Sequence, residues 1–406
     1  MTSMDIKKLF KGIAVVIDDD IHNQDSSIYN ILNQLKAESI PYVEYDSLPD
    51  KKVVDNLQNV SFVLLDWKLE TARSVSEIIS GVQTPAEYGE NSIKENIDFL
   101  KAIQKVCFCP IFIFTDEDVS DIFAKLEEEK LYKSNSCSNI LVKAKSEFRN
   151  SNSLFENLEK WIKSIAPIYL LKAWDSAYQI AKNNLFIDFQ NRSPFWVKIL
   201  WNTYKKDGVD PSIELEEFIT KSIQTQSSPL QLDNTLFESL DDTNDSKELI
   251  DCLERQSFVN TSFIDKDKPD TGDVFIISGT PYINIRPCCD LVPRSGKNVD
   301  DVELYLLRGE KTTNQEKINN KYLEEYGHFN DNDTCFTVYP ICSGYLITFK
   351  FKELKIQKWS EIKDKRKGRL LHPYLTKLQM KYGAYIQRQG LPRMPDELFI
   401  KQTKSE

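Results

Sequence analysis

The sequence predicts an α/β N-terminal domain built on a doubly wound, five-stranded parallel sheet, followed by a helical middle and a β-rich C-terminal module. Two observations predict the first domain. Five short apolar segments alternate with segments of helical apolar spacing, and polar residues follow directly on four of the five. Strands buried on both faces appear as continuous apolar runs, and their alternation with helices is typical of parallel sheets.

The five expected strands cover residues 13–17, 42–45, 61–65, 110–114 and 139–142. Between them apolar residues recur every three or four positions, which is the spacing of an amphipathic helix. Ile28, Ile31 and Leu35 after the first strand are one example. A final helix is expected over residues 154–165. The arrangement is that of a flavodoxin-like fold.

Charged and hydroxyl side chains stand where four of these strands end. Asp18 and Asp19 follow the first strand, Asp66 the third, Thr115 the fourth and Lys143 the fifth. In doubly wound sheets functional residues gather at the carboxyl ends of the strands. Converging carboxylates repel each other and attract a divalent cation, and ligand sets made only of oxygen favour Mg²⁺ or Mn²⁺.

These elements resemble the receiver domain of two-component response regulators, over about residues 10–166. The matching segments are Val-Val-Ile-Asp-Asp (15–19), Val-Leu-Leu-Asp (63–66), Ile-Phe-Thr (113–115) and Leu-Val-Lys (141–143). The resemblance implies a cytoplasmic prokaryotic signalling protein. In such a protein a histidine kinase or another phosphoryl donor modifies the domain, which then controls the output.

The resemblance also assigns roles to the residues at the strand ends. Asp66 would be the phosphoacceptor, and Thr115 and Lys143 would bind the phosphoryl oxygens. The implied magnesium ligands are Asp18, Asp19, Asp66 and the backbone carbonyl of Lys68. The register of the acidic triplet leaves Asp19 and Asp20 as an alternative pair.

The sequence departs from the family pattern at several positions. An insertion near residues 70–89 lengthens the chain between Asp66 and Thr115, and Asp116 stands where the family has a small residue. Ala144 replaces the usual proline after the lysine, and Ile140 occupies the position of the switch aromatic. The alternative hypothesis is therefore a degenerate, phosphorylation-independent receiver that acts as a scaffold in a multi-protein assembly. Antiviral (phage) defence is one such setting.

The composition is that of a globular protein without a membrane segment. The apolar runs are of strand length, and no secretory signal is visible. Eight cysteines in such a chain indicate reduced thiols in a cytoplasm. Three domains are expected, over residues 1–166, 167–265 and 266–406.

The middle region shows helix-type spacing over residues 169–186, 196–204 and 214–223. We expect it to transmit a state, to bind a protein partner or to form a homodimer. The C-terminal module has strand patterns over residues 272–277, 282–286, 302–307, 336–339 and 344–351, which favour a small barrel or curled sheet. A helix with a basic face, residues 370–387, follows.

The C-terminal region is basic although the whole chain carries a net charge of −10. From residue 349 to the end, 15 lysines and arginines stand against 6 acidic residues. The candidate basic patch consists of Lys363, Lys365, Arg366, Lys367 and Arg369. Such a patch beside aromatic residues suits single-stranded nucleic acid, a protein interface or a solvated surface.

A third hypothesis makes the C-terminal module an enzyme that acts on nucleic acid through Cys289, Asp290 or His372. The Cys289-Asp290-Leu291 segment and Gly390-Leu-Pro392 resemble stretches of bacterial proteins from defence-type gene clusters. Zinc is not expected, since the cysteines and histidines lack the spacing of zinc ligands. Buried structural thiols are the favoured interpretation of the cysteines.

Overall fold

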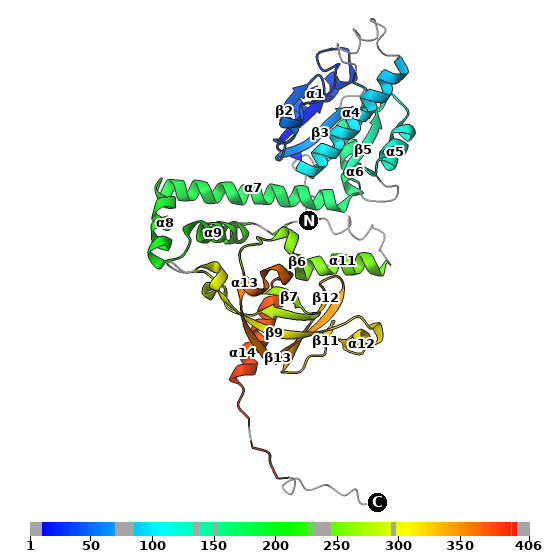
Figure 1. The fold of residues 1–406 in the computed structure, drawn as a ribbon. Coiled ribbons are helices and arrows are strands. Elements are labelled where there is room, and N and C mark those ends of the chain that lie inside the picture. Colours follow the sequence, from blue (N-terminus) through cyan, green and yellow to red (C-terminus); the bar gives the residue numbers. More distant parts are fainter. Residues whose placement is uncertain are drawn as a thin grey trace, which may run out of the picture. The chain divides into compact units, whose positions relative to one another are not determined.

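The computed structural model describes residues 10–69, 85–132, 138–148, 153–227, 229–230, 232, 245–293, 298–390 and 392–395. The chain divides into two compact units. The first consists of Met1–Val197 and Glu216–Asp241, and the second of Lys198–Leu215 and Asp242–Glu406. Each unit is described by itself (Figure 1).

The N-terminal sheet has five parallel strands in the order β2-β1-β3-β4-β5, which confirms the predicted architecture. The strands are β1 (Ile13–Ile17), β2 (Tyr42–Tyr45), β3 (Val60–Asp66), β4 (Ile111–Thr115) and β5 (Ile140–Ala144). All four neighbouring pairs run in the same direction, so the carboxyl ends of the strands lie along one edge.

Helices cover both faces of this sheet because successive strand residues point to opposite sides. The helices are α1 (Ser27–Ala37), α2 (Lys51–Val54), α4 (Pro85–Val106), α5 (Val119–Glu128) and α6 (Ser153–Lys163). Ala14 and Val16 of β1 belong to an apolar cluster with α1 and α6. Val15 and Ile17 belong to a second cluster with α2, α4 and α5.

The middle of the chain is helical, as the sequence predicts. Its helices are α7 (Ala166–Arg192), α8 (Trp196–Asp207), α9 (Pro211–Gln226) and α11 (Ser246–Ser257). α7 packs against α9 within the first unit, where Ala181 and Leu185 are buried with Ile223. α11 belongs to the second unit. Among the helices that the structure describes, none combines the length and apolar character needed to cross a lipid bilayer.

The second unit contains a seven-stranded antiparallel sheet in the order β12-β13-β9-β8-β7-β14-β6. Its strands are β6 (Phe258–Asn260), β7 (Asp273–Ile277), β8 (Thr280–Asn284), β9 (Glu303–Thr312), β12 (Cys335–Ile341), β13 (Tyr345–Lys358) and β14 (Arg366–Leu370). A small sheet pairs β10 (Tyr322–Leu323) with β11 (His328–Phe329). The helices are α12 (Gln315–Asn319), α13 (Trp359–Ile362) and α14 (Tyr374–Gln387).

The seven-stranded sheet curls so that its two edges approach each other. Ser257, just before β6, donates its hydroxyl to the carbonyl of Pro340 in β12, at 3.2 Å. Phe258 of β6 and Val338 of β12 are buried in the same apolar cluster, together with Leu378 of α14. Residues 366–370, which include three members of the predicted basic patch, form β14, a strand that the sequence did not predict. Residues 366–370 alternate between inward and outward positions there.

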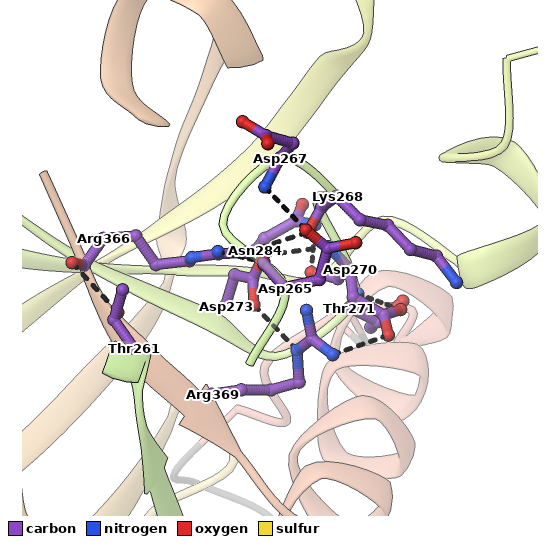
Figure 2. Close-up of polar contacts among 10 residues, drawn as sticks. All are labelled: Thr261, Asp265, Asp267, Lys268, Asp270, Thr271, Asp273, Asn284, Arg366 and Arg369. Carbon is purple, nitrogen blue, oxygen red and sulfur yellow. Dashed lines mark hydrogen bonds and ion pairs between the residues drawn. The ribbon is translucent and has the colours of Figure 1, made fainter. Parts of the chain in front are cut away.

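A buried ion-pair network joins β14 to β7 (Figure 2). The Asp273 carboxylate lies 3.2 Å from Arg366 Nη1 and 2.8 Å from Arg369 Nε. Arg369 Nη1 also contacts Asp270, at 2.9 Å. Asp273 and Arg366 are almost fully buried. Two arginines thus neutralise one buried carboxylate, which is the condition for keeping such a charge inside a protein.

The same arginine holds the loop of residues 265–272, where the sequence places a domain boundary. Arg366 donates to the carbonyls of Lys268, at 2.9 Å, and of Asp265. The side-chain amide of Asn284 donates to the carbonyl of Asp270, at 2.9 Å. The loop therefore lies inside the second unit and is bound to β8 and β14.

Replacing Arg366 by alanine will leave the Asp273 carboxylate buried with only one cationic partner. Removing one member of a buried pair costs about 3–5 kcal/mol. We therefore expect the Arg366→Ala variant to lose about that much free energy of unfolding in urea titrations followed by circular dichroism. Its exposed neighbour provides the control, since Lys367→Ala should stay within about 0.5 kcal/mol of the parent. Equal midpoints for the two variants would contradict the network.

Candidate metal site

Three carboxylates meet at the carboxyl edge of the N-terminal sheet. β1 and β3 are parallel neighbours with Ile17 beside Leu65, so Asp18 after β1 and Asp66 at the end of β3 lie next to each other. One oxygen from each of Asp18, Asp19 and Asp66 lies within 4.8 Å of the other two. Asp18 and Asp66 are buried, and Asp19 is half-buried. The cluster therefore contains Asp18 and Asp19 rather than the alternative pair with Asp20.

The lysine that reaches this cluster is Lys145, not Lys143. The Lys145 Nζ atom lies 2.9 Å from Asp66 Oδ2 and 3.2 Å from Asp18 Oδ2. Lys143 instead forms an ion pair with Glu147 at 2.9 Å and is one-third exposed. This corrects the placement of Lys143 in the pocket.

The error has a simple geometric origin. β5 continues through Ala144, which pairs with Thr115, so the strand ends two residues later than the sequence pattern predicts. Lys145 begins the short 3₁₀ turn that follows, and its side chain is buried there. Two lysines separated by one residue satisfy the same strand-end pattern. Only the exact end of the strand distinguishes them.

Burial dominates the electrostatics of the cluster. It raises the pKa of Asp66 to about 7, with the charge of Asp18 adding to the rise and the Lys145 ammonium opposing it. Burial likewise raises the pKa of Asp18. For Lys145, burial lowers the pKa, but the two carboxylates together outweigh it and the net shift is upward. One ammonium thus faces three acidic groups, and the site favours a further cation or a proton.

The donor set fits a hard divalent cation. Asp18 Oδ2 is buried and accepts no hydrogen bond from the residues that the structure describes, although Lys145 lies at ion-pair distance. All the clustered side chains offer oxygen, which suits Mg²⁺ or Mn²⁺. The backbone N–H of Lys68 donates to Asp66 Oδ1 at 3.3 Å. The ligand role of the Lys68 carbonyl stays a prediction.

Thr115 lies at the same edge of the sheet, at the end of β4. Its side chain is fully buried. Its hydroxyl oxygen accepts a hydrogen bond from the backbone N–H of Glu117 at 2.9 Å, which fixes the side chain while its O–H remains a donor. Asp66 pairs with Phe114 across the strands, so Thr115 is one residue beyond the acid. The side chain of Asp116 is exposed and is not one of the clustered carboxylates.

Two polar residues of α4 that the sequence analysis missed hold the chain just after Asp66. The amide of the fully buried Asn96 donates to the carbonyl of Trp67. The hydroxyl of Ser92 lies 3.5 Å from the carbonyl of Leu69. Ser92 and Asn96 are four residues apart, which places both on one face of the helix, and this spacing could have identified them from the sequence. Of the predicted insertion near residues 70–89, residues 70–84 lie outside the described residues, and α4 begins at Pro85.

The residues of the candidate basic patch do not form one free basic surface. Arg366 is buried in the Asp273 network, and Arg369 shares it. Lys363 pairs with Asp300 at 3.2 Å and Lys365 with its neighbour Asp364, and Lys367 is exposed. Arg366 and Arg369 therefore do not belong to an exposed patch, whereas Lys363, Lys365 and Lys367 are exposed, and a ligand for them stays a prediction.

The candidate catalytic residues of the C-terminal module make different contacts. His372 Nδ1 lies 2.6 Å from the hydroxyl of Thr376 at the start of α14. Cys289 and Asp290 are exposed and line a pocket of about 470 Å³ beside Arg286. Within the described parts of the chain, the only group of three candidate metal ligands is the Asp18–Asp19–Asp66 cluster.

Comparison of the sequence with protein-family models and with curated proteins finds no match. The functional conclusion therefore depends on the geometry of the acidic cluster. Its distinctive feature is the combination of three clustered carboxylates with one buried lysine at a single sheet edge.

Replacing Lys145 by methionine tests which lysine serves the cluster. Removing its charge leaves two buried carboxylates uncompensated. The free energy of unfolding should therefore fall by about 3–5 kcal/mol at pH 8 without divalent cations. The loss should shrink at pH 6, where Asp66 is protonated. Lys143→Met removes only a partly exposed pair and should cost no more than about 0.5 kcal/mol. Urea unfolding of both variants at the two pH values measures this, and equal losses would contradict the placement.

The affinity for Mg²⁺ should depend on pH with a midpoint set by Asp66. Because this carboxyl keeps its proton up to a pKa of about 7, protons compete with the metal below that value. Apparent affinity should fall by about tenfold per pH unit well below pH 7 and level off above it. Without metal, the stability of the fold has the opposite pH dependence. The raised pKa of Asp66 stabilises the folded state at low pH, and this contribution is lost as the pH rises through about 7. Titration calorimetry from pH 5.5 to 8.5 measures the binding, and a flat profile would exclude Asp66 as a ligand.

Proposed function

We propose that the N-terminal unit is a response-regulator receiver domain that accepts a phosphoryl group on Asp66 and thereby controls a C-terminal binding module. The observation that carries this proposal is the Lys145 ammonium placed 2.9 Å from Asp66 beside the acidic cluster. The buried hydroxyl of Thr115 lies at the same edge of the sheet. The sequence resemblance of residues 10–166 supports the same interpretation.

The chemistry follows from the positions of these groups. An oxygen of the Asp66 carboxylate attacks the phosphorus of a phosphohistidine or a small acyl phosphate. A new O–P bond forms while the bond to the leaving group breaks, and the product is an aspartyl phosphate. A bound Mg²⁺, held by Asp18, Asp19 and Asp66, would supply charge neutralisation. Lys145 pairs with one phosphoryl oxygen, and Thr115 donates its hydroxyl hydrogen to another.

With Lys145 as the functional lysine, the comparison with the family pattern shifts by two residues. The position after the lysine is Ser146, and the switch position three residues before it is Val142, which is buried. An aliphatic side chain occupies the switch position in either register. The output of this domain must therefore rely on something other than the rotation of an aromatic side chain.

The proposed output module is the second unit, acting by binding in the cytoplasm. Arg366 and Arg369 of the predicted basic patch are held by Asp273, and Lys363 pairs with Asp300, which favours a protein partner over nucleic acid at this patch. The first unit offers a separate surface, because its helix α7 exposes large apolar side chains, including Trp174 and Ile187. Such side chains are typical of partner-binding or homodimer surfaces.

The second candidate function is a phosphorylation-independent scaffold in a multi-protein assembly, with phage defence as one setting. The aliphatic switch position and the exposed acid Asp116 after Thr115 favour it. In that case Asp66 and Lys145 would serve stability, and partner binding would not respond to phosphoryl donors.

Incubation with a small acyl phosphate and Mg²⁺ separates the two functions. We expect a slower-migrating species on phosphate-affinity gels, because Asp66 becomes an acyl phosphate. Asp66→Asn should abolish it and Lys145→Met should reduce it strongly, while Lys143→Met should leave it unchanged. Beryllofluoride should raise the thermal midpoint of the parent but not of Asp66→Asn. No modification in the parent, with a co-purifying partner retained by Asp66→Asn, would favour the scaffold.

A further inference from the structure

Two cysteines lie close together just before β4, at the amino edge of the sheet, whereas the acidic cluster lies at its carboxyl edge. Cys107 and Cys109 belong to the short segment between α4 and β4, and both side chains contact the same apolar cluster. Phe108 between them is 57% exposed. The amide of Asn139 donates to the carbonyl of Cys109 at 2.9 Å, which holds the segment in place. The two thiols therefore share one side of a fixed segment.

The two thiols differ in access. Cys109 is 2% exposed, whereas Cys107 is half-buried and can meet a small reagent. The Cys107 sulfur lies 3.8 Å from the carbonyl of Val60, the first residue of β3. An accessible thiol beside a buried one is the arrangement of a reacting and a resolving cysteine.

A buried ammonium lies beside this pair. Lys172 of α7 is 4% exposed, and its Nζ atom lies 3.2 Å from the carbonyl and 3.0 Å from the hydroxyl of Ser61. Both acceptors are neutral, and burial lowers the pKa of Lys172, while the negative charge of Asp175 opposes this shift. Its charge favours the thiolate at both cysteines. A thiolate at this position would therefore gain a buried cation as a neighbour.

The proton is distributed unequally between the two thiols. A hydrogen bond from the Cys109 thiol lowers the pKa of Cys107 to about 7, against the opposing effects of burial and of the Asp175 charge. The same hydrogen bond, together with burial, raises the pKa of Cys109. Cys107 is thus the nucleophile of the pair and Cys109 keeps its hydrogen.

We propose that Cys107 and Cys109 form a redox-active dithiol that reacts with peroxides. The Cys107 thiolate attacks a peroxide oxygen, so that an S–O bond forms and the O–O bond breaks. The released alkoxide or hydroxide takes up a proton. The Cys109 sulfur then attacks the Cys107 sulfenic acid, an S–S bond forms, and water leaves with the Cys109 proton. The two thiols lose two electrons, and the peroxide is reduced to an alcohol or water.

This site does not depend on phosphorylation of Asp66. Reduced cytoplasmic thiols form disulfides mainly in redox sensing or catalysis, and such bonds are transient. Oxidation here removes the thiolate that faces Lys172, whose ammonium ties α7 to Ser61 of β3. The modification would thus act where α7 is bound to the sheet.

Alkylation kinetics of the full chain test the nucleophile. With iodoacetamide and peptide mass mapping, the rate at Cys107 should reach half its plateau at a pH of about 7. Exposed Cys252 is the internal comparison, and Cys107 should react about fivefold faster at pH 7 despite its partial burial. In Lys172→Met the midpoint at Cys107 should move upward. A rate at Cys107 below that of Cys252 throughout would overturn the proposal.

Peroxide treatment tests the disulfide. In the parent, the peptide carrying both cysteines should lose two hydrogens in mass and regain them with a dithiol reductant. In Cys109→Ser, a diketone probe should instead capture a sulfenic acid at Cys107, and Cys107→Ser should show neither product. Over-oxidised Cys107 without any Cys107–Cys109 bond in the parent would overturn the dithiol. Circular dichroism confirms that each variant is folded, and phosphorylation of Asp66 in the cysteine variants is scored separately.

Discussion

The contact between Lys145 and the carboxylates of Asp66 and Asp18 is the constraint on which the N-terminal unit depends. Two buried acids cannot both ionise next to each other without a compensating charge, and one ammonium is available to both. The fold brings these groups together because parallel pairing places the ends of β1, β3 and β5 along one edge. The remaining negative charge can be met by a metal ion or a proton. This shortage of positive charge is the reason why we propose that the site responds to both.

The sequence was sufficient to predict the strands of the first sheet and the acids at their ends. Continuous apolar runs bounded by Asp18, Asp66 and Thr115 leave little freedom in where these strands stop. The lysine was ambiguous, because an error of two residues in the end of β5 exchanges Lys143 for Lys145. Strand ends depend on pairing with a neighbour, here Thr115 with Ala144, which local pattern does not encode.

The basic stretch of the C-terminal module shows a different limit of sequence reasoning. Composition predicts an exposed patch, but residues 366–370 form a strand whose alternate side chains point inward. Arg366 then meets Asp273, an acid 93 residues earlier in the chain. Long-range ion pairs of this kind carry no local signal. Two of the positive residues in this stretch, Arg366 and Arg369, thus stabilise the fold through Asp273.

The strand β3 links two chemically distinct regions of the same domain. Asp66 stands at its carboxyl end, and the Ser61 contact with Lys172 of α7 lies near its amino end. A central strand paired on both sides cannot lengthen, so a small axial shift at one terminus must appear at the other. α7 is thus attached near the amino end of the strand that carries Asp66 at its carboxyl end, so one continuous strand joins this helix to the acidic cluster.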